Sequence, residues 1–175
     1  MKIIKHQAAE SADITTLITT LNNDDALVRH YTRQALVRIG PAAVPALIEK
    51  LSDPSDQLRR EATRVLSQIN DSRAATALVV ALEDDNPGVR WLASGGLISL
   101  GEAGLVSLLE ALKQHPDSVR LREGAHHVLR ILAKKGRYVE IVTPVLAALE
   151  DIEPAIELPL AAHSVLKMLT PVPTY

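Results

Sequence analysis

The stretch LVVALEDDNPGVRWLASGGLISLG, residues 78–101, has two counterparts earlier in the chain. Residues 47–70 read LIEKLSDPSDQLRREATRVLSQIN, residues 17–40 read LITTLNNDDALVRHYTRQALVRIG, and the three align without gaps. Leucine fills the first and fifth positions of each stretch, and an apolar residue fills the twelfth. Self-similarity at a period of about 30 residues is typical of repeat architectures.

Each repeat has the pattern of two helices joined by a turn. In the third repeat, apolar residues at helical spacing form one stripe over residues 77–82 and a second over residues 89–100. Between them, Asn86 is suited to an N-cap and Pro87 to the first helical turn. Gly101 is suited to the C-cap that ends the second helix. The corresponding positions of the first two repeats hold Gly40 and Asn70.

The last two repeats are longer and resemble each other. VRLREGAHHVLRIL begins at Val119 and IELPLAAHSVLKML begins at Ile156, and each has two extra residues before the small residue of the second helix. That small residue, which lets neighbouring helices approach, is Ala62, Ala93, Ala125 or Ala162. The sequence therefore predicts an all-α fold, a right-handed α-solenoid of about five helix pairs that forms a single domain over residues 1–175. The expected repeats cover about 13–40, 41–71, 72–102, 103–135 and 136–170.

The segment IGPAAVPALIEKLSDPSDQLRREATRVLSQI, residues 39–69, resembles a HEAT repeat. More narrowly, it is similar to the short HEAT-like repeats of phycobilin lyases. The matching marks are Gly40-Pro41, Pro45, the Asp53-Pro54 turn and an arginine column made of Arg29, Arg59, Arg90 and Arg120. The resemblance implies a structural role for this column, in which each arginine bridges to an aspartate of the neighbouring repeat and to turn carbonyls.

Composition excludes several classes of function. The 175 residues include 47% apolar and only 2% aromatic residues, the net charge is −2, and cysteine is absent. The near-neutral charge argues against a general attraction to nucleic acid or anionic membranes. Without cysteine there are no disulfides and no thiolate metal ligands, which fits a cytoplasmic protein. No apolar run is long enough for a secretory signal or a membrane helix, and no cofactor is implied.

We find no sequence motif of a catalytic centre. Serines occur without a nucleophile pattern, and no HExxH metal motif is present. The sequence therefore predicts that the chain is not an enzyme. His126 and His163 align and could meet on adjacent helices, with Glu123 as a third metal ligand. We prefer the interpretation that these histidines are surface groups and that no metal is bound.

The predicted partner-binding surface lies opposite the core stripe of the second helices, which the resemblance places on a concave face. Its centre is Trp91, the only tryptophan, because exposed tryptophan and arginine are enriched in binding hot spots. The candidate binding residues are Trp91, Arg60, Arg64, Gly95, Ile98, His30, Arg33, His127 and Arg130. The fifth repeat is expected to add Leu160, His163, Ser164 and Lys167. The cations of this face outnumber its one predicted acid, Glu123.

These features favour a non-enzymatic protein–protein interaction scaffold that binds an acidic or mixed partner on a locally basic, concave face. The alternative is a phycobilin-lyase-like protein that handles a tetrapyrrole, whose propionates would suit Arg60 and Arg64. A third hypothesis is nucleic-acid binding, which the small number of groove cations disfavours. No membrane partner is expected, and the sequence leaves the oligomeric state open.

Overall fold

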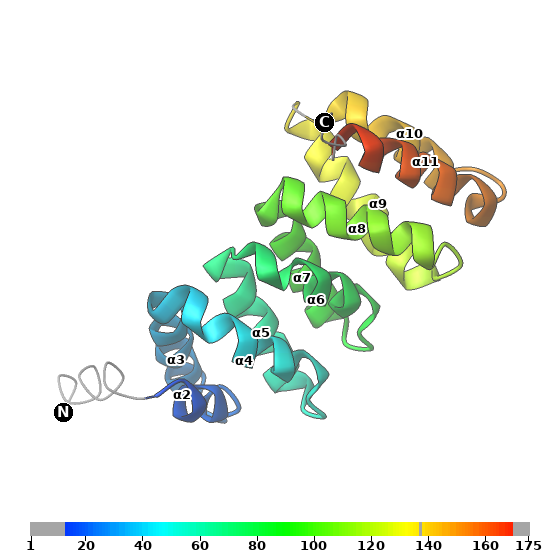
Figure 1. The fold of residues 1–175 in the computed structure, drawn as a ribbon. Helices are drawn as coiled ribbons and strands as arrows, with labels where there is room; N and C mark the ends of the chain where they lie inside the picture. Colours follow the sequence, from blue (N-terminus) through cyan, green and yellow to red (C-terminus); the bar gives the residue numbers. More distant parts are fainter. Residues whose placement is uncertain (1–12, 137, 170–175) are drawn as a thin grey trace.

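The computed structural model describes residues 13–136 and 138–169, and in this part of the chain the helices stack in pairs as a solenoid (Figure 1). The first helices of the pairs are α2 (Ile14–Thr20), α4 (Val44–Glu49), α6 (Ala75–Val80), α8 (Glu102–Gln114) and α10 (Val139–Leu149). The second helices are α3 (Ala26–Ile39), α5 (Asp56–Ile69), α7 (Pro87–Leu100), α9 (Val119–Lys134) and α11 (Pro154–Leu169). Short 3-10 turns flank α4 and α6: η1 (Gly40–Ala43), η2 (Lys50–Ser52), η3 (Ser72–Ala74) and η4 (Ala81–Glu83). The predicted all-α solenoid is confirmed.

Side chains in the turns fix where the second helices begin. The Asp25 carboxylate accepts a hydrogen bond from the Leu27 backbone N–H at the start of α3, at 2.8 Å. The Asn86 side chain does the same for Gly88 at the start of α7, at 2.8 Å. These bonds satisfy backbone donors that a helix cannot satisfy itself. The predicted C-caps are also present, because the backbone has a positive φ at Gly40, Asn70 and Gly101.

The core is a continuous column of aliphatic side chains that runs through the stack. The leading leucines of the first helices are buried in all of the first four pairs: Leu17, Leu47, Leu78 and Leu108. The small residues of the second helices are fully buried as predicted: Ala62, Ala93, Ala125 and Ala162. Each pair thus buries its apolar stripe against its neighbours, which is how a solenoid is stabilised.

The two extra residues of the fourth and fifth repeats lie before the second helix, not within it. Ser118 caps α9 by accepting from the Leu121 backbone N–H, and Leu121 is buried, whereas Val119 is exposed. Likewise Leu158 is buried and Ile156 is exposed. The repeat pattern aligns Val119 and Ile156 with Val28, Leu58 and Val89 at the twelfth position, and this alignment is therefore wrong. Both residues are apolar, so hydrophobicity alone did not distinguish the two registers.

The last helix pair is arranged differently from the other four. α10 packs against the second helix α9, while α11 packs against the first helix α8 as well as against α10. Figure 1 shows α11 continuing the layer of α4, α6 and α8, with α10 in the layer behind. The two helices have exchanged layers relative to the preceding pairs. Residues of α11 therefore do not continue the exposed face of α3, α5, α7 and α9.

None of the described helices has both the length and the apolar character that crossing a membrane would require.

Candidate functional site

Trp91 projects from the side of α7 that faces away from the core. Its side chain is 67% exposed, as its position opposite the core stripe predicts. Across the gap to the next repeat, its ring centroid lies 5.2 Å from that of His127 on α9, with the two planes tilted by 45°. The contact brings together two of the predicted binding residues and holds an exposed aromatic ring in a defined place.

The surface beyond Trp91 on the same helix is open. Gly95 lies one turn along α7, is exposed, and has no atom within 4 Å of where a Cβ would stand. By contrast, a Cβ on the adjacent Gly96 would lie 2.7 Å from the Ser67 hydroxyl oxygen of α5. Ile98 follows as a half-buried residue that packs against the core. Gly95 therefore leaves space beside the indole, while Gly96 permits close helix packing.

A buried carboxylate lies beneath the arginines of this face. Glu61 on α5 is only 2% exposed, and it accepts a 2.7 Å charge-assisted hydrogen bond from Arg33 on α3. Arg29 and Arg64 also place nitrogens 3.7 Å from its other oxygen. The single negative charge of Glu61 thus lies beside three guanidinium groups, so this cluster has a net positive charge. Glu61 is not among the residues predicted from the sequence, where Glu123 is the one acid of this face. Its position three residues after the core residue Leu58 and three before Arg64 could have indicated that it lies between the core and the exposed face.

Arg60 extends from α5 toward the first turn of α7. Its Cδ lies 3.3 Å from where a Cβ on Gly88 would stand, and Trp91 lies about one turn further along the same helix. The buried Nε of Arg60 has no hydrogen-bond partner among the described residues. Arg60 therefore places a cationic side chain against α7 about one turn before Trp91, and it forms no ion pair within 4 Å among residues 13–136 and 138–169.

The remaining predicted binding residues lie further from this centre. His30 is exposed on α3, where its ring contacts Tyr31 edge-on at 5.6 Å between centroids. Arg130 is exposed near the C-terminal end of α9. The structure places both on second helices but shows no direct contact from either to Trp91. The expected contribution of the fifth repeat is wrong, because the exchange of α10 and α11 moves Leu160, His163, Ser164 and Lys167 into the other layer.

The exposed surface of the second helices is also narrower than the sequence predicts. The repeat pattern puts Thr63 and Ser94 on it, since they hold the position that Arg33 has in the first repeat. Both are buried, and their hydroxyls donate to backbone carbonyls of their own helices, those of Arg59 and Arg90. Short hydroxyl side chains can satisfy themselves in this way and fit between closely packed helices. On α5 and α7 this row is therefore closed, and the most exposed residues of the strip there are those in the rows of Trp91 and Gly95.

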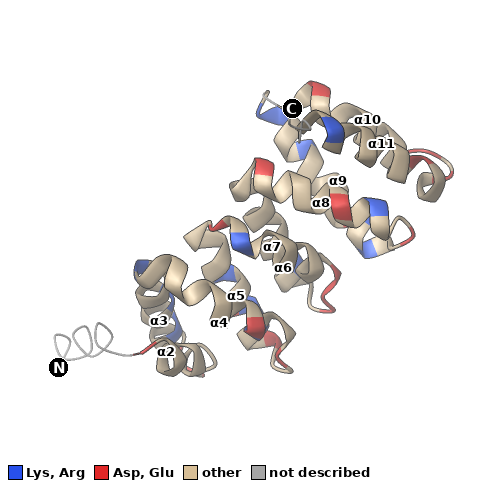
Figure 2. Cartoon of the chain, in the orientation of Figure 1, with Lys and Arg blue, Asp and Glu red and all other residues tan. Residues whose placement is uncertain are grey.

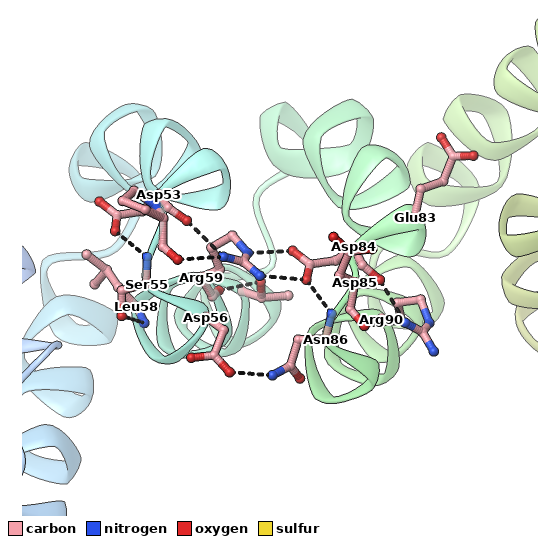
Figure 3. A network of polar contacts seen from close by, with 12 residues as sticks. Asp53, Ser55, Asp56, Leu58, Arg59, Glu83, Asp84, Asp85, Asn86 and Arg90 are labelled. Atoms are coloured by element: carbon pink, nitrogen blue, oxygen red, sulfur yellow. Dashed lines mark hydrogen bonds and ion pairs between the residues drawn. The ribbon is translucent and has the colours of Figure 1, made fainter.

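The arginine column has only part of the structural role that the resemblance implies: Arg29, Arg59 and Arg90 all donate to carbonyls of their own turns, but among the described residues only Arg59 bonds to an aspartate of the next repeat. Arg59 donates two hydrogen bonds to the Asp84 carboxylate of the next repeat, at 2.7 and 3.0 Å, and one to the carbonyl of Asp53 at 2.9 Å (Figure 3). Burial alone would raise the pKa of Asp84, but the bonds from Arg59 and from the Asn86 backbone N–H outweigh it and lower that pKa. Figure 2 shows acidic residues in several of the turns within the helix pairs, and others on helices such as α8. At Arg59 the column links two repeats, and elsewhere its arginines hold their own turns.

In the fourth repeat the equivalent arginine is Arg122, not Arg120. Arg122 donates to the carbonyl of Pro116 in its own turn, at 2.8 Å, as the other arginines of the column do. Arg120 instead reaches back to the Asp85 carboxylate and the Glu83 carbonyl of the preceding turn. The assignment of Arg120 was wrong for the same reason as that of Val119, since the extra residues precede α9.

The histidines that sequence alignment paired do not meet. His126 on α9 lies 3.1 Å from the Glu150 carboxylate at the end of α10, while His163 is exposed on α11 in the other layer. Within residues 13–136 and 138–169, no group of three or more histidine, aspartate or glutamate side chains is arranged to hold a metal ion.

Comparison with known proteins supports the repeat architecture. Residues 14–94 and 44–130 match the sequence model of the HEAT-repeat family. The chain is 31% identical over 103 residues to deoxyhypusine hydroxylase-B from Oryza sativa subsp. japonica, a match that covers 57% of this chain and 34% of the relative. It is 34% identical over 94 residues to phycocyanobilin lyase subunit beta from Nostoc sp., covering 53% of this chain and 47% of the relative.

These relatives confirm one sequence prediction and contradict another. The similarity to HEAT repeats and to a phycobilin lyase is confirmed. The prediction that the chain is not an enzyme is wrong as a plain exclusion, because both relatives are named as enzymes. The fold of a repeat protein does not determine its function, so a lack of short catalytic motifs does not exclude an enzymatic role. The matched region spans less than half of the length of either relative.

Proposed function

The chain belongs to the family of HEAT-repeat proteins, and on this basis we propose that it binds a partner protein through the exposed strip of its second helices. We call this strip the Trp91 face, and define it by Trp91, Gly95 and Ile98 of α7, His127 of α9, and Arg33, Arg60 and Arg64 of α3 and α5. The observation that carries the proposal is the exposed indole of Trp91, fixed against His127 rather than buried.

The Trp91 face combines the two elements of a binding hot spot. The indole offers a large apolar surface that loses little freedom on binding, and Gly95 leaves room beside it for an apolar side chain of the partner. An aromatic ring that is already held in place reduces the entropy cost of association. We therefore expect the partner to insert an aliphatic or aromatic anchor next to Trp91.

The charge of the face favours an acidic partner. Arg33 and Arg64 share the single buried carboxylate of Glu61, and Arg60 lies alongside. Carboxylates of a partner would find guanidinium groups whose positions are already set by Glu61 and by packing on α7. Complementary charge mainly raises the association rate and the specificity, so the apolar anchor is expected to supply most of the affinity.

A peptide-display experiment tests this proposal. A library of peptides is selected on the wild-type protein, on Trp91→Ala, and on Val80→Ala as a matched control. Val80 is 66% exposed on α6, outside the Trp91 face, so its exposure matches that of Trp91. We expect the wild type and the control to enrich acidic peptides with one apolar anchor, and Trp91→Ala to lose them. Equal enrichment by all three proteins would refute the proposal.

The similarity to a phycocyanobilin lyase subunit favours a second candidate function, the handling of a tetrapyrrole. The flat rings of Trp91 and His127 could stack on a bilin, and Arg60 and Arg64 could bind its propionate groups. Titration of the protein into phycocyanobilin distinguishes the candidates. A red shift of the bilin absorbance that Arg60→Ala with Arg64→Ala abolishes would support this function, and an unchanged spectrum would exclude it.

A further inference from the structure

The last helix presents an apolar surface to the outside of the stack. Ile156, Leu160 and Met168 are 60%, 64% and 70% exposed, and with Ser164 they follow one another every four residues along α11. They lie opposite the residues of α11 that face the core, which are Leu158, Ala162, Val165 and Leu166. We define the α11 face as Ile156, Glu157, Leu160, His163, Ser164, Lys167 and Met168.

The apolar stripe of α11 lies beside a hollow in the protein surface. α11 packs on α8 and α10, and its opposite side is exposed. A hollow of about 380 Å³ lies beside it, between α10 and α11, with Pro144, Ala147 and Leu160 among its lining residues. Single apolar residues are common on protein surfaces, whereas an exposed apolar stripe next to a hollow is typical of a contact surface.

The charges on the α11 face are arranged so that the face complements itself. Glu157 lies five residues before Ala162 and Lys167 lies five residues after it, which separates them by about 15 Å along the helix. Neither forms an ion pair within the described part of the chain. If a second copy of α11 packs antiparallel about a two-fold axis near Ala162, the Ile156–Glu157 end of each helix meets the Lys167–Met168 end of the other. Opposite charges then meet twice in one symmetric contact.

We propose that the α11 face joins two copies of this chain in an antiparallel, two-fold symmetric dimer. Leu160 lies at the centre of the exposed stripe and occupies the hollow between α10 and α11 of the second copy. The exchange of layers by α10 and α11 packs α11 against α8, with the α11 face exposed on its other side. The proposal is independent of the Trp91 face, which lies on the second helices of the other pairs.

Sedimentation velocity over a series of protein concentrations tests the dimer. The full chain is expected to sediment with twice its monomer mass at the higher concentrations. Leu160→Glu is expected to weaken the dimer by at least about tenfold, since each copy contributes the substitution once. Val80→Glu, an equally exposed apolar position on α6, is the matched control and should leave the dimer intact. Far-UV circular dichroism checks that both variants remain helical.

Charge reversal tests whether the second copy is the occupant. Glu157→Lys and Lys167→Glu should each weaken the dimer, by about fivefold, because they place like charges together at both ends of the contact. The double variant that carries both reversals should recover most of the wild-type affinity. A monomer at every concentration overturns the proposal. A dimer that withstands Leu160→Glu, or single reversals that the double variant does not rescue, also overturns it.

Discussion

The rings of Trp91 and His127 lie 5.2 Å apart between centroids and bridge two successive second helices, α7 and α9. The contact leaves the indole 67% exposed, so it positions the ring without removing it from solvent. A tryptophan in this state differs both from a core residue and from a freely rotating surface residue. A ring that is positioned before a ligand arrives lowers the entropy cost of binding, which is why we propose Trp91 as the binding anchor.

The first prediction concerns the fluorescence of Trp91, which reports this one place because the chain has no other tryptophan. We expect red-shifted emission, since the indole is mostly in water. Iodide should quench it more strongly than caesium, because Arg60 and Arg64 of the neighbouring helix attract an anion. Arg60→Gln with Arg64→Gln should remove that preference. A blue-shifted emission that neither ion quenches would show that the indole is buried.

The adjacent glycines of α7 provide a matched pair of substitutions. Gly95→Ala should raise the free energy of unfolding by up to about 1 kcal/mol, since alanine favours the helix and its Cβ meets open space. Gly96→Ala should lower it, because its Cβ would stand 2.7 Å from the Ser67 hydroxyl and 2.9 Å from Leu78. Urea denaturation of the two variants measures both effects. Equal changes of the same sign would contradict the packing of α5 on α7.

Glu61→Gln should destabilise the protein although it keeps the shape of the side chain. Removal of this buried charge leaves Arg29, Arg33 and Arg64 close together without a counter-ion, which we expect to cost about 2–3 kcal/mol. Chemical denaturation measures the loss. Glu123→Gln, at an exposed position on α9, is the control and should change the stability by less than about 0.5 kcal/mol. If both substitutions have the same small effect, Glu61 does not hold the arginines together.

The bridge between Arg59 and Asp84 should make the protein sensitive to acid. The pKa of Asp84 is lowered in the folded state from its ordinary value of 3.8, so the unfolded chain binds a proton at a pH where the folded chain does not. The bridge therefore contributes stability above about pH 4, which is lost as the pH falls through the lowered pKa. Asp84→Asn should flatten the decline of stability in that range, as measured by urea unfolding at successive pH values. Asp117→Asn, in an exposed turn, should leave the decline unchanged.

The periodic part of the sequence predicted the fold well because leucine spacing, small residues and cap residues all pointed to the same helix pairs. It failed where two registers had equal hydrophobicity, as for Val119 and Leu121. It also failed for Glu61, because a charged residue beside the core stripe is ordinarily assigned to solvent. The exchange of α10 and α11 depends on contacts between distant helices, which the repeat pattern does not contain.

The most direct test of the central claim is the affinity of an acidic, apolar-anchored peptide, selected on the wild-type protein, for the wild type and for Trp91→Ala. Isothermal titration calorimetry measures both affinities, and chemical denaturation measures both stabilities. We predict that the substitution weakens binding by about 30-fold, or about 2 kcal/mol, while the free energy of unfolding changes by less than about 0.5 kcal/mol. Equal affinity of the two proteins for the peptide, or a Trp91→Ala protein that unfolds, would contradict the assignment of Trp91 as an exposed binding anchor.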